Sequence, residues 1–376
     1  MERTNSPSTS GLDGIVVAQT ALSDVDGERG RLVIRGHSVE DLVERATFED
    51  ICGLMWHAAW PSPGEREALR AALSVARQLA FTLVNSLGGA LQATDGMEAL
   101  RAAVGHLRAG DPQVDRLRLT AAIPVFAAAW ARAQSGQPAV PPQAGLSHAA
   151  DYLQMLAGRE PAAPRVAALD AYLCCVADHG MNASTFVARV VTSTGSDQIS
   201  AVVAAIGALK GPLHGGAPGR VLDMLDAVGH PADARAWLRA ELEAGRRIMG
   251  MGHRIYRVRD PRAAALEHAI SLLERADGDH RRLTLARAVE REAERLLSER
   301  HPERSLRTNV EFYTAVLLDA IGMPRTLFAP TFAASRVVGW CAHIDEQRRV
   351  GRLIRPASTY VGPEVVNAAV LPRARP

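Results

Sequence analysis

The chain has 376 residues, of which 47% are hydrophobic and 22% charged, and its formal net charge is +2. This length can bury a sizeable core, and the near balance of charge excludes a general basic face for nucleic acid. No apolar run reaches the roughly 20 residues that span a membrane, and the first ten residues lack the apolar region of a signal peptide. We therefore expect an ordinary globular protein that works in the cytoplasm, with neither nucleic acid nor a membrane as its partner.

The N-terminal part holds the clearest strand candidate, the short run RLVIR at residues 31–35, which follows a turn-like DGERG. Ser38, followed three residues later by Asp41, resembles a capping box and predicts the start of a helix that continues through Val43. Further along, Ser196 is expected to cap a helix with apolar residues at helical spacing, and Gly211 is expected to end it.

The later elements are also helical. Asp260 followed by a proline predicts a helix start, and Gly278 predicts its end. Residues 279–300 form a charged amphipathic pattern that suits a solvated outer helix; a coiled coil is the alternative, but about three heptads without a strict seam favour it little. Residues 134–145, with three prolines, and residues 158–164 are predicted to be loops. The sequence therefore predicts an all-α fold with a minor N-terminal β element.

The four cysteines give no sign of a redox role. They are Cys52, Cys174, Cys175 and Cys341, each within an apolar helical context. Adjacent cysteines cannot easily reach disulfide geometry, and the spacing differs from that of extracellular disulfide frameworks. We expect them to be buried small apolar groups.

Three segments each place a histidine among glycines beside a predicted helix. They are DHGMN at 178–182, GPLHGG at 211–216 and MGMGHR at 249–254, and NVEF at 309–312 adds a carboxylate. A lone histidine is more often a satisfied polar residue, but neighbouring glycines let a ligand approach closely, and three such loops favour a site that activates a carbon acid. Metal binding is not expected, because the chain has no close His-His or Cys-Cys pair at ligand spacing.

Arginines close to these segments offer sites for an anion. Arg254 and Arg259 read as solvated surface. Arg262 follows a helix start, which should hold it in place, and Arg336 lies in an apolar run with no acidic residue near it in sequence. A buried guanidinium needs a partner, and it binds a carboxylate through two parallel hydrogen bonds. Substrate carboxylates would meet that need.

Several runs together resemble the citrate synthase family. They are residues 11–18, 24–36, 182–186, 207–217, 249–262 and 354–356, and the likeness holds in order from about residue 11 to residue 363. The resemblance implies a mostly helical homodimer with a large domain, residues 1–215 and 323–376, and a small mobile domain, residues 216–322, that closes over the cleft. It also implies condensation of acetyl-CoA with oxaloacetate to citrate and CoA, without a metal or other cofactor.

The resemblance further implies a role for each candidate residue. His214 would meet the enolate oxygen, His253 the oxaloacetate carbonyl, and Glu311 would be the base; His179, Arg262 and Arg336 would bind oxaloacetate, Arg355 would reach the partner subunit's site, and Arg257 would contact the CoA phosphates. A helix expected to start at residues 215–218 would disfavour the protonated form of His214.

Glu311 departs from the family pattern, which usually has aspartate there. The extra methylene moves the carboxylate by about 1.5 Å, and a misplacement of about 1 Å can cost roughly a hundredfold in rate. Either the neighbouring structure suits glutamate, or the chain is a slow or altered synthase. Two alternatives stay open: a 2-methylcitrate synthase that uses propionyl-CoA, and a non-catalytic homologue that binds oxaloacetate or CoA.

Overall fold

The computed structural model describes residues 11–363 except 13, 216–217 and 279. The strands are β1 (Ser23–Asp26), β2 (Arg31–Ile34) and β3 (His37–Ser38). The helices are α1 (Val39–Arg45), α2 (Phe48–His57), α3 (Pro63–Thr82), α4 (Gly96–Val104), α5 (Pro112–Gln134), α6 (His148–Ala157), α7 (Ala163–Val176), α8 (Ala183–Ser193), α9 (Gln198–Leu209), α10 (Pro218–Val228), α11 (Ala234–Glu243), α12 (Pro261–Asp277), α13 (Arg281–Arg300), α14 (Val310–Ala320) and α15 (Phe328–Val350). Short 3-10 helices are Val84–Ser86, Gly88–Gln92, Pro231–Asp233 and Arg325–Leu327. The prediction of an all-α fold with a minor N-terminal β element is confirmed.

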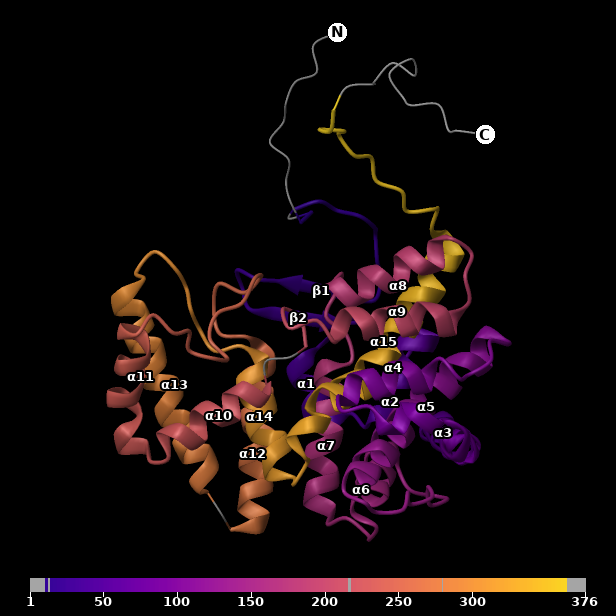
Figure 1. Ribbon diagram of the computed structural model, residues 1–376, viewed down its shortest axis with the longest axis horizontal. Helices are drawn as coiled ribbons and strands as arrows, with labels where there is room; N and C mark the ends of the chain where they lie inside the picture. Colours follow the sequence, from indigo (N-terminus) through magenta and orange to yellow (C-terminus); the bar gives the residue numbers. More distant parts are fainter. Residues whose placement is uncertain (1–10, 13, 216–217, 279, 364–376) are drawn as a thin grey trace, which may run out of the picture.

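Figure 1 shows α10, α11, α13 and α14 gathered on one side of the molecule and α2 to α5, α8 and α9 on the other. Helix α7 packs against α12 and α14, and α1 packs against α7 and α12, so these helices join the two sides. Helix α15 runs through the second group, in contact with α5, α7, α8 and α9. No helix of the described part of the chain is long and apolar enough to cross a membrane.

The N-terminal sheet is antiparallel, in the order β1-β2-β3. The predicted strand at residues 31–35 is confirmed but ends at Ile34, because Arg35 adopts a left-handed φ of 49°. Leu32 and Ile34 point into the core and are fully buried. The predicted cap is also confirmed, since the Ser38 side chain accepts from the Asp41 backbone N–H at the start of α1.

Helix α12 matches the prediction at both ends. The Asp260 side chain accepts from the Arg262 N–H, and Gly278 ends the helix with φ 75°. The predicted cap at Ser196 was wrong by one residue. Asp197 caps α9 instead and accepts from the Ser200 N–H, and α9 ends at Leu209, two residues before the predicted stop. Two neighbouring polar side chains can both cap a helix, and tertiary packing selects between them.

The predicted loops are slightly too long. Helix α5 continues through Gln134, and α7 begins at Ala163 because Pro164 suits the first turn of a helix. Helix α13 covers most of the predicted outer helix, starting at Arg281, and residue 279 lies outside the described residues. All four cysteines are buried free thiols, as predicted.

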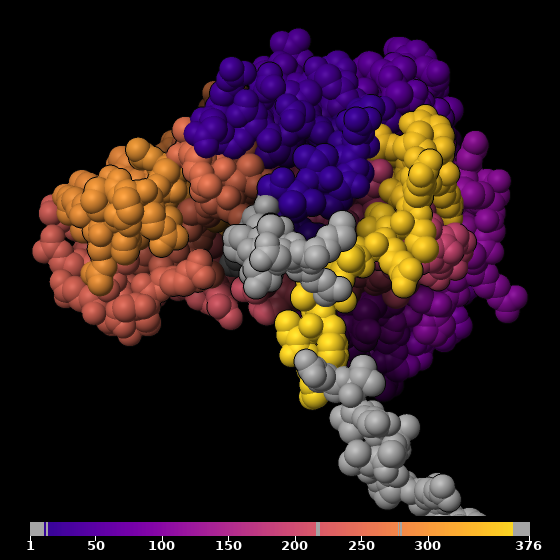
Figure 2. All heavy atoms as spheres, turned by 90° about the horizontal axis from the view of Figure 1, so that it is seen from above, coloured from indigo at the N-terminus to yellow at the C-terminus, as the bar shows by residue number. Residues whose placement is uncertain are grey.

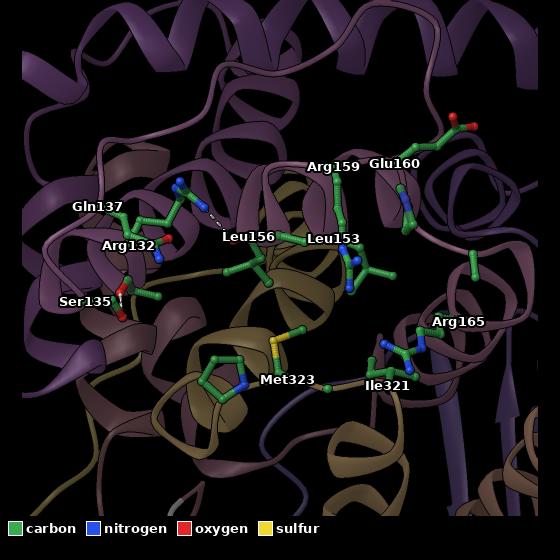
Figure 3. A pocket seen from close by; sticks show the side chains of 16 residues that line it. Arg132, Ser135, Gln137, Leu153, Leu156, Arg159, Glu160, Arg165, Ile321 and Met323 are labelled. Carbon is green, nitrogen blue, oxygen red and sulfur yellow. Dashed lines mark hydrogen bonds between the residues drawn. The ribbon is translucent and has the colours of Figure 1, made fainter. Parts of the chain in front are cut away.

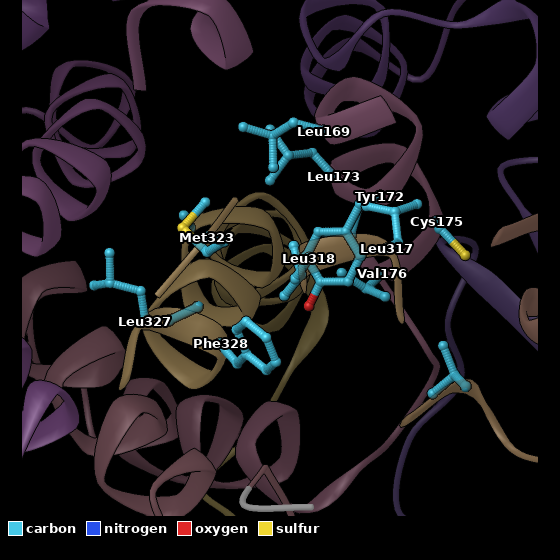
Figure 4. Close-up of a cluster of buried hydrophobic side chains, with 14 of the residues drawn as sticks. Leu169, Tyr172, Leu173, Cys175, Val176, Leu317, Leu318, Met323, Leu327 and Phe328 are labelled. Carbon is cyan, nitrogen blue, oxygen red and sulfur yellow. The ribbon is translucent and has the colours of Figure 1, made fainter. Parts of the chain in front are cut away.

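One part of the core ties together helices α7, α14 and α15. Figure 4 shows side chains of α7 facing those of α14 and the start of α15. Its labelled members include Leu169, Leu173, Val176, Leu317, Leu318 and Phe328, and each is at most 2% exposed. Each such side chain contributes about 1.5–3 kcal/mol by burial. The three helices are therefore held rigidly relative to one another.

Candidate active site

The histidine loops that follow α7 and precede α12 meet in the structure. The rings of His179 and His253 have centroids 5.6 Å apart, and Tyr256 packs against both. The Tyr256 hydroxyl lies 3.1 Å from Nε2 of His179. Burial, followed by the nearby charges of Arg262 and Arg336, holds the pKa of His179 well below its usual range. His179 is therefore neutral.

The backbone fixes the tautomer of His253. Its Nδ1 accepts from the backbone N–H groups of Ile255 and Tyr256, both at 3.1 Å. Since these groups can only donate, the ring proton is on Nε2, which can donate to a ligand. Burial, and then the charge of Arg262, lowers the pKa of His253 to about 4, so the ring stays neutral at physiological pH.

The opposite tautomer is fixed at His214. The backbone N–H of Ser184 donates to its Nε2 at 3.3 Å, and the Ser184 hydroxyl lies 2.9 Å from the same nitrogen. The proton is therefore on Nδ1. Trp340 Nε1 donates to the Ser184 hydroxyl at 3.1 Å and holds it in place. Burial, and then the charge of Arg336, lowers the pKa of His214 to about 4.

Burial and the charge of Arg336 account for the neutrality of His214 within the described residues, and the predicted contribution of the helix start at residues 215–218 stays a prediction. Helix α10 does start at Pro218, as expected, but residues 216–217, whose amides were expected to act on His214, lie outside the described residues. The amide that faces the ring belongs to Ser184, in the first turn of α8.

Arg262 is held by a bidentate ion pair. Its Nε lies 3.0 Å from Oδ1 of Asp260, and its Nη2 lies 2.7 Å from Oδ2. Asp260 also accepts from the backbone N–H of Val310 at 3.2 Å, which joins the start of α12 to the start of α14. Burial lowers the pKa of Arg262, but the pair with Asp260 outweighs it and raises that pKa above its usual value. Arg262 is therefore fixed and charged, and its Nη1 makes no hydrogen bond with a described residue.

Arg336 has no carboxylate partner among the described residues, as its apolar sequence context predicted. Its Nε donates to the Val176 carbonyl at 2.7 Å, and its guanidinium lies 4.7 Å from the centre of the Phe332 ring. Nη2 is buried without a hydrogen bond to any described residue. Burial lowers the pKa of Arg336 to about 10. A buried guanidinium without a carboxylate partner lowers the stability of the folded protein, and an anionic ligand would offset this loss.

Glu311 lies in the first turn of α14, and that turn is tied to the His253 loop. The backbone N–H of Glu311 donates to Oδ1 of Asn309 at 3.0 Å, and Nδ2 of Asn309 donates to the Gly252 carbonyl at 2.8 Å. Gly250 has a φ of 74°, and a Cβ there would lie 2.9 Å from Cβ of Phe312, so the loop needs glycine at this position.

The environment of the Glu311 carboxyl group raises its pKa to about 7. Burial is the main cause, and the positive charges of Arg262 and Arg336 offset it only in part. Near pH 7 about half of this carboxylate is ionised. A base with a pKa near the working pH is well matched to proton transfer.

Arg257 and Arg355 lie apart from this cluster. Arg257 is exposed on the loop before α12, where its backbone N–H donates to the Gly27 carbonyl at 2.9 Å. Arg355 is exposed in the extended segment after α15, which leaves the body of the molecule in Figure 2. The backbone N–H of the neighbouring Ile354 donates to the Ser193 hydroxyl at the far end of α8, about 14 Å along the helix from Ser184 beside His214. Arg355 therefore lies near the end of α8 that is farther from His214.

Three residues around the site were missed from the sequence. Tyr256 is the only aromatic residue within its arginine-rich loop, and Ser184 is a hydroxyl two positions after the Asn182 cap. Those positions were usable signals. Trp340 had no signal in the sequence, because it lies 156 residues from Ser184 and only the fold brings the two together.

The cluster can bind an anion and activate a carbon acid. It combines two neutral histidines with defined donor atoms, two buried guanidinium groups and a carboxyl group with a pKa near 7. The described residues contain no group of three or more histidine, cysteine or acidic side chains that could hold a metal ion.

Comparisons with known proteins identify the family. A family model described as citrate synthase, C-terminal domain, matches residues 11–357. The citrate synthase of Haloferax volcanii is 39% identical over 94% of this chain and 95% of its own, and a 2-methylcitrate synthase of Mycobacterium tuberculosis is 36% identical over 94% and 90%. The solved ternary complex of Thermoplasma acidophilum citrate synthase with carboxymethyl coenzyme A and oxaloacetate is 27% identical, covers 96% of this chain and 98% of that one, and has a TM-score of 0.83. With this fold and this cluster, the chain belongs to the citrate synthase family and is an enzyme of that type.

Proposed function

We propose that the protein condenses acetyl-CoA with oxaloacetate and water to give citrate and CoA, with Glu311 as the base. The observation that carries this proposal is a carboxyl group with a pKa of about 7 under the charges of Arg262 and Arg336, the same two groups that act on His253 and His214, whose donor nitrogens are fixed. Glu311 removes a proton from the thioester methyl group while Nδ1–H of His214 donates to the developing enolate oxygen. The carbon then attacks the oxaloacetate ketone, whose oxygen receives a proton from Nε2–H of His253. Water hydrolyses the citryl thioester.

Oxaloacetate binding is assigned to His179, His253, Arg262 and Arg336 from the same chain. The two guanidinium groups are buried, and each keeps a nitrogen without a hydrogen bond to a described residue, which suits the two carboxylates of this substrate. Arg257, exposed on the loop before α12, is assigned to the CoA phosphates. No metal or other cofactor takes part in this scheme.

A homodimer belongs to the proposal. Helices α8 and α9 pack together and leave the apolar side chains of Phe186, Val187, Val190 and Val203 only partly buried, a pattern typical of a protein interface. Arg355 follows Ile354, which is bonded to the end of α8. A second subunit across this face would receive Arg355 at its oxaloacetate site.

Closure of a small domain over the cleft is also part of the proposal. Helices α10 to α14 lie on the left-hand side of Figure 1 and belong to the proposed small domain, residues 216–322, whereas residues 1–215 and 323–376 would form the large domain. Closure would exclude water until the carbon-carbon bond has formed. We also assign the protein to the cytoplasm, because buried unpaired thiols suit a reducing compartment.

The acyl group can be tested by comparing acetyl-CoA with propionyl-CoA in a thiol-release assay. We expect a higher kcat/KM with acetyl-CoA, by no more than about 10–200-fold, because one methylene in a pocket is worth about 1–3 kcal/mol. A higher value with propionyl-CoA would make the protein a 2-methylcitrate synthase. Calorimetric binding of oxaloacetate without citrate formation at saturating acetyl-CoA would instead indicate a non-catalytic homologue.

The pH dependence of kcat/KM for acetyl-CoA should show the titration of Glu311. The base must be ionised and its pKa is about 7, so activity should rise with pH, reach half of its maximum near pH 7 and level off above about pH 8. The pKa values of His214 and His253, about 4, leave both rings neutral throughout this range. An acid limb centred near pH 4 to 5 would show that an ordinary carboxylate is titrating instead.

A further inference from the structure

A cavity lies at the ends of α7 and α14 that are distant from the site. Its volume is about 500 Å³, within the range of small-molecule sites. Figure 3 shows it between the ends of α5 and α6, the start of α7 and the connector from Ile321 to Pro324, which joins α14 to the last helices.

Positive charge dominates the lining of this cavity. Arg159 and Arg165 make no ion pair or side-chain hydrogen bond with any described residue, and both guanidinium groups point into the space in Figure 3. Arg132 donates to two backbone carbonyls, at 2.6 Å and 2.9 Å, and forms no ion pair with a described residue. Glu160 is the acidic residue of the lining, and its side chain points away from the space.

The rest of the lining is apolar with a few polar groups. Leu153, Leu156, Ile321 and Met323 form an apolar surface, and Gln137 lies at one edge. Such a cavity can bind the anionic group of a ligand through its arginines and the apolar part of the same ligand through its leucine, isoleucine and methionine side chains. Helix α7 also begins there without a side-chain cap, at Ala162, which adds the positive end of its dipole.

We propose that this cavity binds a small organic phosphate. Guanidinium groups bind phosphate oxygens through paired hydrogen bonds, so Arg159 and Arg165 hold the phosphate while Leu156 and Met323 contact the organic part. The same chemistry is found in a nucleotide and in a phosphorylated carboxylic acid.

A ligand here would influence the site through three elements. Helix α7 starts at the cavity, spans about 21 Å and leads to His179. Helix α14 carries Glu311 in its first turn and ends one residue before Ile321. The connector then leads to α15, which carries Arg336. We therefore infer that the ligand regulates turnover. This regulatory effect rests on the proposed function, whereas the binding of the ligand does not depend on it.

Binding is tested by calorimetry with protein saturated with oxaloacetate and CoA, so that the active site is occupied. ATP, phosphoenolpyruvate and inorganic phosphate are titrated separately. At least one organic phosphate should bind at one site per chain. The double variant Arg159→Gln/Arg165→Gln should weaken it at least tenfold. The matched control Arg235→Gln/Arg239→Gln, which removes two exposed arginine charges from α11, should change it less than twofold.

The comparison of ATP with phosphoenolpyruvate tells which source of organic phosphate the cavity takes. Three results would overturn the proposal: no binding of either compound, equal loss in both double variants, or binding of inorganic phosphate as tight as that of the organic probes. The bound probe should also change kcat for citrate at saturating substrates in the parent and leave it unchanged in Arg159→Gln/Arg165→Gln. An unchanged kcat in the parent would refute the regulatory role, and the binding result would stand by itself even if the enzyme made no citrate.

Discussion

Replacing Glu311 with glutamine should lower kcat for citrate formation by about 10²- to 10⁴-fold. Glutamine keeps the size of the side chain but cannot accept the methyl proton, so the loss measures the base itself. The affinity for oxaloacetate should change little, because the proposed contacts to that substrate come from His179, Arg262 and Arg336. The measurement is thiol release at saturating substrates, with oxaloacetate binding followed by calorimetry.

Glu311→Asp is the companion variant, since the family usually has aspartate here. We expect a lower kcat, because the shorter side chain withdraws the carboxylate by about 1.5 Å from a pocket adjusted to glutamate. A higher kcat would mean that the pocket is still shaped for aspartate. If Glu311→Gln keeps turnover within a few-fold of the parent, Glu311 is not the base.

The fold could be predicted well where the signals are local. The start of α12 at Asp260 and Pro261 and its end at Gly278 need only the residues themselves. The cap of α9 could not be chosen from the sequence, because Ser196 and Asp197 are equally suited to the role. The strand ended one residue earlier than predicted because the backbone of Arg35 adopts a left-handed conformation. An arginine gives no sequence signal for this conformation.

The site could likewise be predicted only where the signals are local in sequence. Glycines around each histidine predicted loops that a ligand can approach, and the apolar neighbours of Arg336 predicted a buried guanidinium without a local partner. The tautomers could not be predicted. His214 receives its hydrogen bond from a residue 30 positions away, and the two amides that face His253 do so only in this loop conformation. Likewise, the raised pKa of Glu311 comes from burial, which only the fold creates.

The effect of replacing a buried arginine on stability should depend on the group that the arginine contacts. Arg336 and Arg189 allow this comparison because they are equally buried. Both are 1% exposed. Arg189 lies 2.7 Å from the carboxylate of Glu346, whereas Arg336 forms no ion pair with a described residue and contacts the Val176 carbonyl and the Phe332 ring. Removing one member of a buried ion pair costs about 3–5 kcal/mol. Arg336 has no such pair to lose in the protein without ligand.

Arg336→Met should therefore raise the KM for oxaloacetate by about 10²- to 10³-fold, because a buried charge pair with the substrate carboxylate is lost. The free energy of unfolding of the unliganded protein should change by less than about 1 kcal/mol, since loss of a costly unpaired cation offsets loss of one hydrogen bond. Arg189→Met should instead lower that free energy by about 3–5 kcal/mol. Urea denaturation with and without oxaloacetate measures both effects, and oxaloacetate should stabilise the parent but hardly stabilise Arg336→Met. If Arg336→Met loses as much stability as Arg189→Met while its KM stays near that of the parent, Arg336 supports the fold and does not bind the substrate.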